Sequence, residues 1–170
     1  MNDPGTLNET TVIGLGNPLI GDDGLGLAAL ARLREEWELP PGVKLVDGGT
    51  WGMNLLPVIE QSDRLILLDA IDVGAPPGAL VTLERRELPL LLTMKVSPHQ
   101  VDLRDVLALA EFRGRLPADT VALGIQPGSV GLAGELSAPV RQALDTLIRR
   151  IVQRLESWGH SCRPRSHVHA

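Results

Sequence analysis

Short apolar runs alternate with segments of helical periodicity along this 170-residue chain, and this alternation restricts its fold more than any other feature. Apolar and β-branched runs of strand length lie at 11–15, 43–46, 64–71, 79–83 and 120–125. Apolar residues recur at helical spacing within 22–37, 53–61, 99–112 and from residue 137 onward. Strands that alternate with helices form right-handed βαβ units with parallel strands. We therefore predict an α/β fold in a single domain, a three-layer sandwich whose mostly parallel, twisted sheet of about five strands has helices on both faces.

The two ends of the chain lack this pattern. The last predicted helix still has one apolar face, formed by Val140, Leu144, Leu147, Ile148, Ile151 and Leu155. Residues 159–170 show no periodicity beyond it, and the first residues are polar and acidic. We expect a flexible N-terminus over 1–10, a folded domain over 11–158 and a disordered tail over 159–170.

Charge and composition exclude several classes of protein. The formal net charge of −5 argues against a nucleic-acid-binding protein, which needs a basic face. The longest apolar runs fall far short of the roughly 20 residues that cross a membrane. The N-terminus does not resemble a secretory signal, and the single cysteine, Cys162, excludes an intramolecular disulfide and a cysteine-built zinc site. We expect a cytoplasmic protein that neither binds nucleic acid nor inserts into a membrane.

The loop after the first predicted strand is rich in glycine but does not suit a phosphate. In parallel sheets, ligands bind beyond the carboxyl ends of the strands, which directs attention to this loop. The third glycine of a dinucleotide fingerprint is replaced by Leu19. Asp22 and Asp23 stand where a phosphate loop needs Lys and Ser or Thr, and they would repel an anion. The loop is therefore suited to a cation or a hydrogen-bond donor, with Asp22 expected to cap the following helix.

Asp69 and His99 are two further candidates for a site. Asp69 ends the apolar run of the third predicted strand, where a buried carboxylate needs a partner: either the N–H groups of a neighbouring loop or a ligand. His99 is the only histidine outside the last eleven residues, and a lone histidine is often structural. One imidazole with two strand-end carboxylates also suits a divalent metal that keeps open positions for water or substrate.

Four blocks of residues, in order, resemble the [NiFe]-hydrogenase maturation endopeptidases. They are Gly14-Leu15-Gly16-Asn17 with Asp22-Asp23-Gly24-Leu25-Gly26, Asp47-Gly48-Gly49-Thr50, Leu68-Asp69-Ala70, and Ser97-Pro98-His99-Gln100. The resemblance extends from about residue 11 to about residue 156. It implies a protease that removes a C-terminal extension from the hydrogenase large-subunit precursor after nickel insertion.

The resemblance also implies roles for individual residues. Asp23, at a position that the family fills with Glu or Asp, forms a nickel-recognition triad with Asp69 and His99. The segment Asp47, Gly48, Gly49 and Thr50 belongs to the substrate cleft. The nickel is carried by the substrate, and another divalent metal can substitute for it in vitro. The resemblance assigns no catalytic residue apart from the triad.

Two other functions are open to a chain with these residues. A metal-dependent maturation chaperone would hold the same large subunit without cutting it, and a cleavage assay separates it from the protease. A nucleotide-binding or small-ligand-binding α/β domain is the third possibility, and the missing phosphate-loop lysine and third glycine disfavour it.

Overall fold

A computed structural model describes residues 8–49, 52–89, 99–128 and 134–166, and for residues 99–102 it describes only the backbone. Its centre is a five-stranded sheet with the order β3-β1-β4-β6-β5. The strands are β1 (Thr10–Leu15), β3 (Val43–Gly49), β4 (Arg64–Ala70), β5 (Leu80–Glu84) and β6 (Asp119–Ile125). Four of them run parallel, and β5 pairs antiparallel with β6 at one edge. The predicted α/β fold with a mostly parallel sheet is confirmed.

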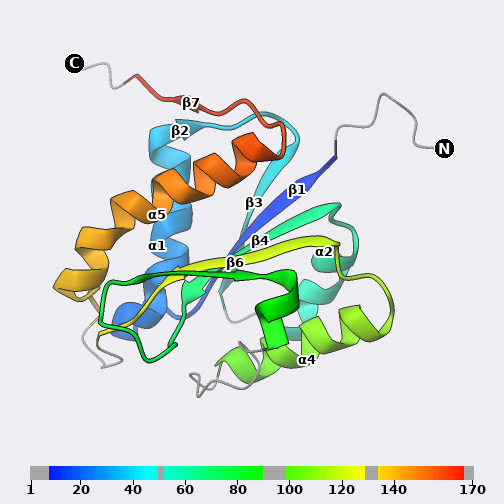
Figure 1. The fold of residues 1–170 in the computed structure, drawn as a ribbon, viewed down its shortest axis with the longest axis horizontal. Coiled ribbons are helices and arrows are strands. Elements are labelled where there is room, and N and C mark those ends of the chain that lie inside the picture. The colour runs from blue at the N-terminus through cyan, green and yellow to red at the C-terminus, as the bar shows by residue number, and fades with distance from the viewer. Residues whose placement is uncertain (1–7, 50–51, 90–98, 129–133, 167–170) are drawn as a thin grey trace.

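Helices cover both faces of this sheet, which gives three layers (Figure 1). The helices are α1 (Leu25–Glu36), α2 (Leu56–Glu60), α4 (His99–Phe112) and α5 (Ala138–Ser157). One core cluster joins α1 and α5 to the sheet, and the other joins α2 and α4 to its opposite face. Strands β1, β4 and β6 lie between these layers, so nearly all of their residues are buried. This position explains why their sequences are continuously apolar rather than alternating.

Strand β5 differs because it lies at the edge of the sheet. Its residues alternate between buried and half-buried positions, as expected for a strand with one face on the core. The next residues form a short 3₁₀ helix, η3 (Arg85–Glu87), whose capping box joins Glu84 and Glu87.

The C-terminal segment corrects the sequence prediction of a disordered tail over 159–170. Strand β7 (Arg163–Pro164) pairs antiparallel with β2 (Trp37–Glu38), and the Arg165 N–H donates to the Glu36 carbonyl at 2.7 Å. The buried His160 ring lies with Nε2 2.7 Å from Thr10 Oγ1. A strand of only two residues is too short to show a periodic sequence pattern, and its partner here lies far away in the chain. The last four residues, and residues 1–7 of the predicted flexible N-terminus, lie outside the described part.

Two arginines hold the start of this segment. The Arg64 and Arg154 guanidinium carbons lie 5.6 and 5.7 Å from the centre of the Trp158 ring, and Arg64 also donates to the Trp158 carbonyl at 2.6 Å. Cation–π contacts of this kind are attractive. They fix the chain where it leaves α5. Within the described part of the chain, no helix is both long and apolar enough to cross a membrane.

Candidate functional site

The carboxyl edge of the sheet gathers most of the residues that the sequence marked as a site. Asp47, Gly48 and Gly49 form the end of β3, and Asp69 lies near the end of β4. Asp23 belongs to the 3₁₀ helix η1 (Gly21–Gly24), which follows β1 and contacts β4. Since β1 lies between β3 and β4, these segments are neighbours. Thr50 lies outside the described residues.

Asp23 is held in place by the loop that precedes it. Its side chain is almost inaccessible, and Oδ2 accepts a hydrogen bond from the Asn17 N–H at 2.9 Å. Gly16 has a φ of 103°, and a Cβ there would lie 1.8 Å from the Asp23 carbonyl oxygen. Only glycine tolerates both this backbone conformation and this approach. The Gly16 N–H also donates to the Gly49 carbonyl at 3.3 Å, which joins the Asp23 loop to the end of β3.

Asp69 occupies the corresponding place on the next strand. It is buried, and Oδ1 accepts a hydrogen bond from the Ala70 N–H at 2.8 Å. Gly124 of β6 lies against it, because a Cβ at that position would be 2.1 Å from the Asp69 carbonyl oxygen. Asp47, by contrast, is exposed. Among the predicted site residues, Asp23 and Asp69 are thus buried carboxylates, and Asp47 is open to solvent.

His99 is the first residue of α4, and its side chain lies outside the described part of the structure. The helix is followed by a short connection that enters β6 at its amino end. The end of α4 is therefore near the amino edge of the sheet, and its first turn points toward the carboxyl edge. Among the side chains that the structure describes, no three histidine, cysteine or acidic groups form a cluster suited to a metal ion.

Asp22 does not cap α1 as the sequence predicted. The N-cap position belongs to Gly24, the last residue of the extra turn η1. The Asp22 side chain is fully buried and accepts hydrogen bonds from the Gly128 N–H (2.8 Å), the Ser137 N–H (2.6 Å) and the Ser137 hydroxyl (2.7 Å). An aspartate before a helical pattern suggests a cap, but the 3₁₀ turn that directs the Asp22 side chain elsewhere leaves no local sequence pattern.

Gln126 is a residue at this edge that no sequence pattern marks. Its Oε1 accepts hydrogen bonds from the N–H groups of Val73 (2.8 Å) and Ala75 (3.2 Å), and Nε2 donates to Asp72 Oδ1 at 2.9 Å. These bonds hold the loop that follows Asp69. Together with the Gly74 N–H, the Gln126 amide lowers the pKa of Asp72, because both donate to its carboxylate. A single glutamine after a strand carries no recognisable sequence signal.

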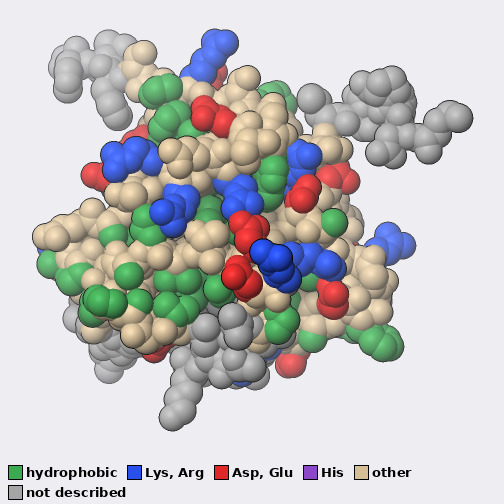
Figure 2. Space-filling model, viewed as in Figure 1, with side chains coloured by type: hydrophobic (Ala, Val, Ile, Leu, Met, Phe, Trp, Pro, Cys, Tyr) green, Lys and Arg blue, Asp and Glu red, His purple; other side chains and the backbone are tan. Residues whose placement is uncertain are grey.

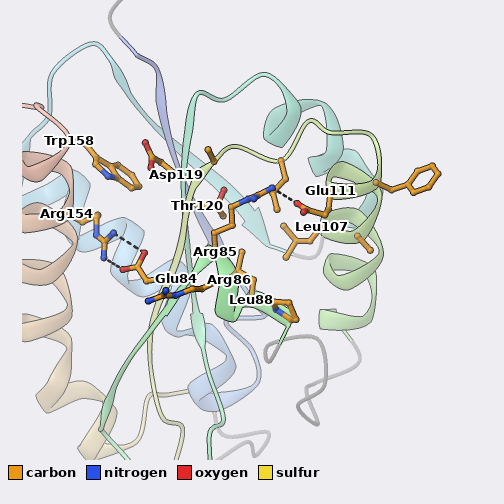
Figure 3. A pocket seen from close by; sticks show the side chains of 15 residues that line it. Glu84, Arg85, Arg86, Leu88, Leu107, Glu111, Asp119, Thr120, Arg154 and Trp158 are labelled. Atoms are coloured by element: carbon orange, nitrogen blue, oxygen red, sulfur yellow. Dashed lines mark hydrogen bonds and ion pairs between the residues drawn. The ribbon is translucent and has the colours of Figure 1, made fainter.

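A pocket of about 870 Å³ lies at the opposite, amino edge of the sheet (Figure 3). Leu88, Leu107 and Trp158 contribute to its lining, together with charged side chains from η3, α4 and α5. Among the charged residues of the lining, Arg154 pairs with Glu84, and Arg85 pairs with Glu111. Figure 2 shows the same mixture of basic and acidic side chains on this face of the molecule. None of the predicted site residues lines this pocket.

Comparisons with known proteins agree on one family. The sequence model described as "Hydrogenase maturation protease" matches residues 28–154. The hydrogenase expression/formation protein HupD of Rhodobacter capsulatus is 38% identical over 87% of this chain and 71% of its own length. The hydrogenase 2 maturation protease of Escherichia coli is 34% identical over 93% of this chain and 97% of its own length.

Solved structures extend this agreement to the fold. The hydrogenase maturating endopeptidase HybD from E. coli superimposes with a TM-score of 0.88 at 34% identity, covering 93% of this chain and 98% of that one. The [NiFe] hydrogenase maturation protease HybD from Thermococcus kodakarensis gives a TM-score of 0.69 at 27% identity, covering 86% and 98%. The sequence match and the shared fold lead to the same conclusion: this chain belongs to the hydrogenase maturation proteases and is an endopeptidase of that family.

Proposed function

We propose that this endopeptidase removes the C-terminal extension of a [NiFe]-hydrogenase large-subunit precursor after nickel insertion, and that it recognises the nickel carried by that substrate. The observation that carries the proposal is the position of Asp23 and Asp69. Their carboxyl groups belong to neighbouring segments at the carboxyl edge, where parallel sheets bind ligands. The name of the T. kodakarensis relative states the [NiFe] class of hydrogenase.

Each residue of the proposed triad contributes one kind of ligand atom. Asp23 and Asp69 supply carboxylate oxygens, and His99 supplies an imidazole nitrogen. Such a mixed set suits a borderline divalent metal and leaves other coordination positions to groups from the substrate. The first turn of α4, which begins at His99, points toward the edge that holds both aspartates. This direction supports a shared site.

The end of β3 is the proposed boundary of the substrate cleft. Asp47 is exposed there, the half-buried Gly49 presents its backbone without a side chain, and Gly48 is buried against the core. A Cβ on Gly48 would lie 2.6 Å from a methyl group of Ile13, so this position cannot carry a side chain. A cleft lined by backbone can accept an extended polypeptide closely. Thr50 completes this segment in the proposal.

Substitutions in the triad test this function directly. In Asp69→Asn the side chain keeps its size but loses its charge, and in His99→Ala the only nitrogen ligand is lost. We expect both variants to cut nickel-loaded precursor at least about 100-fold more slowly than the wild type, as measured by shortening on a gel. Asp119→Asn is the control, because Asp119 lies at the amino edge, where it pairs with Arg64 at 3.2 Å.

The melting temperature of each variant separates recognition from folding. The proposal requires His99→Ala to stay folded and Asp119→Asn to cut at the wild-type rate. Wild-type cleavage by folded His99→Ala would contradict the triad. Tight binding of the precursor by the wild-type protein without any shortening would instead favour the non-cleaving chaperone.

A further inference from the structure

Asp22 joins two segments that are far apart in the sequence. It lies in η1, after β1, whereas its donors Gly128 and Ser137 lie after β6 and at the start of α5. Strand β4 separates β1 from β6 in the sheet. The Asp22 hydrogen bonds therefore join the segments that follow the two neighbours of β4, which is the strand that carries Asp69.

The two adjacent aspartates of η1 have different partners. Successive side chains of a 3₁₀ helix point about 120° apart, because the helix has about three residues per turn. Asp22 accordingly reaches the start of α5, while Asp23 accepts the Asn17 N–H on the other side of the turn. The two residues are adjacent in the backbone. Hydrogen bonds that hold Asp22 in place therefore also hold the Cα of Asp23 in place.

Ser137 is used in an unusual way for a residue at a helix start. It occupies the N-cap of α5 with an extended backbone, yet its side chain makes no capping hydrogen bond. Its hydroxyl donates to Asp22 Oδ2 instead. This hydrogen bond connects the start of α5 to η1, the 3₁₀ helix that carries Asp23.

We infer that Asp22 is a positioning residue: it holds η1 against the start of α5 and so sets the place of the Asp23 carboxyl group relative to Asp69. This inference rests on the proposed function only where it concerns cleavage. Both carboxylate oxygens of Asp22 already accept hydrogen bonds from Gly128 and Ser137, so its side chain acts on the site through η1 rather than as a member of the proposed triad. Catalytic groups that are displaced by about 1 Å lose much of their effect, which makes such support measurable.

Asp22→Asn is the informative substitution because it keeps the size of the side chain. Two donors, the Gly128 N–H and the Ser137 hydroxyl, share Oδ2. An amide has only one accepting oxygen, so when Ser137 N–H keeps it, the NH₂ group faces the Gly128 N–H. The Gly128 N–H then faces a donor in place of its acceptor, and this repulsion moves η1 away from it.

Hydrogen exchange tests the inference without any assumption about cleavage. The Asn17 N–H is bound to Asp23 Oδ2, so its protection reports whether the Asp23 carboxyl group is in place. We expect Asp22→Asn to lower this protection at least about tenfold, and Ser137→Ala to lower it by a smaller factor. Ser137→Ala also serves as the test if Asp22→Asn does not fold.

Ser62→Ala is the matched control for loss of a buried hydrogen bond. The Ser62 hydroxyl donates to the Val58 carbonyl at 2.7 Å and forms a second hydrogen bond, 2.6 Å long, with the Thr11 hydroxyl near the amino edge of the sheet. This variant should lower the melting temperature and leave Asn17 protection within about twofold of the wild type. An equal loss of protection in Ser62→Ala, or unchanged protection in Asp22→Asn, would overturn the inference.

Cleavage kinetics provide the second arm. With nickel-loaded precursor, Asp22→Asn should lower kcat about 10-fold to 100-fold and change KM less than about threefold, since the substrate contacts remain. Ser62→Ala should keep the wild-type kcat. An unchanged kcat in Asp22→Asn would overturn the positioning role. If the wild-type protein cuts no precursor, the proposed function fails, and Asn17 protection alone decides the role of Asp22.

Discussion

The aspartates of the candidate site differ in how deeply they are buried. Asp23 and Asp69 are 4% and 3% exposed, whereas Asp47 is open to solvent. A buried carboxylate is costly unless hydrogen bonds hold it, and backbone N–H groups donate to both of the buried ones. Their side chains are therefore fixed before a substrate arrives. The exposed side chain of Asp47 is not held in this way, so it is better suited to adjust its conformation to a bound polypeptide.

His160 makes the stability of the protein depend on pH. Burial, and to a lesser extent the nearby Arg64 charge, lower the pKa of His160 below its usual 6.5. The unfolded chain therefore binds this proton more readily than the folded one. The contribution of His160 is fully present above pH 6.5 and is lost as the pH falls through the lower pKa of the folded state.

We expect the melting temperature of the wild-type protein to fall on acidification below pH 6.5 more steeply than that of His160→Gln. Gln can still form a hydrogen bond with Thr10 Oγ1 but does not titrate. The difference in unfolding free energy changes by at most about 1.4 kcal/mol per pH unit, the limit for one proton. Identical pH profiles of the two proteins would show that His160 is not the titrating group.

At the scale of elements, the C-terminal segment is part of the folded domain. It pairs with β2, places His160 against Thr10 and packs Trp158 and Cys162 on the core that α1 and α5 share. Burial, and to a lesser extent the nearby Glu156 charge, also raise the pKa of the Cys162 thiol, which keeps it protonated and unreactive. All of these contacts lie at the amino edge, away from the candidate site.

A chain that ends at Ser157 should be less stable by about 3 kcal/mol, because it loses the Trp158 packing and several hydrogen bonds. Urea denaturation measures this loss. Cleavage of precursor at low temperature should remain, since the site lies at the other edge. A chain that ends at Ser166 keeps every contact named here and is the control. Equal stability of the two truncated chains would contradict the role given to this segment.

The sequence predicted those elements whose pattern is local. Continuous apolar runs located β1, β4 and β6, and the stripe from Val140 to Leu155 located α5. The rule that ligands bind at strand ends then led to Asp23 and Asp69. Both aspartates lie at that edge in the structure.

The parts that could not be predicted depend on contacts between distant segments. The pairing of β2 with β7 involves two residues on each strand. Asp22 looks like a helix cap in the sequence, and its true partners are more than 100 residues away. Gln126 acts on a loop that precedes it by about 50 residues. No periodic or local pattern reports such contacts.

At the scale of the whole molecule, the carboxyl and amino edges of the sheet differ in charge. The carboxyl edge carries Asp22, Asp23, Asp47, Asp69 and Asp72, and its described loops at 16–26, 71–79 and 125–128 contain neither Lys nor Arg. The amino edge carries paired arginines, the pocket and the C-terminal segment. Negative charge concentrated at one edge raises the local concentration of cationic groups. This distribution favours a metal-bearing substrate at the carboxyl edge.

The central claim is that the protease acts on a precursor that already carries nickel. The most direct measurement offers the wild-type protein equal amounts of nickel-loaded and nickel-free large-subunit precursor, with the nickel content of each determined beforehand, and follows their shortening by mass spectrometry. We expect the nickel-loaded precursor to lose its C-terminal extension and the nickel-free precursor to stay intact, even at high enzyme concentration. Cleavage of both precursors at the same rate would contradict the claim.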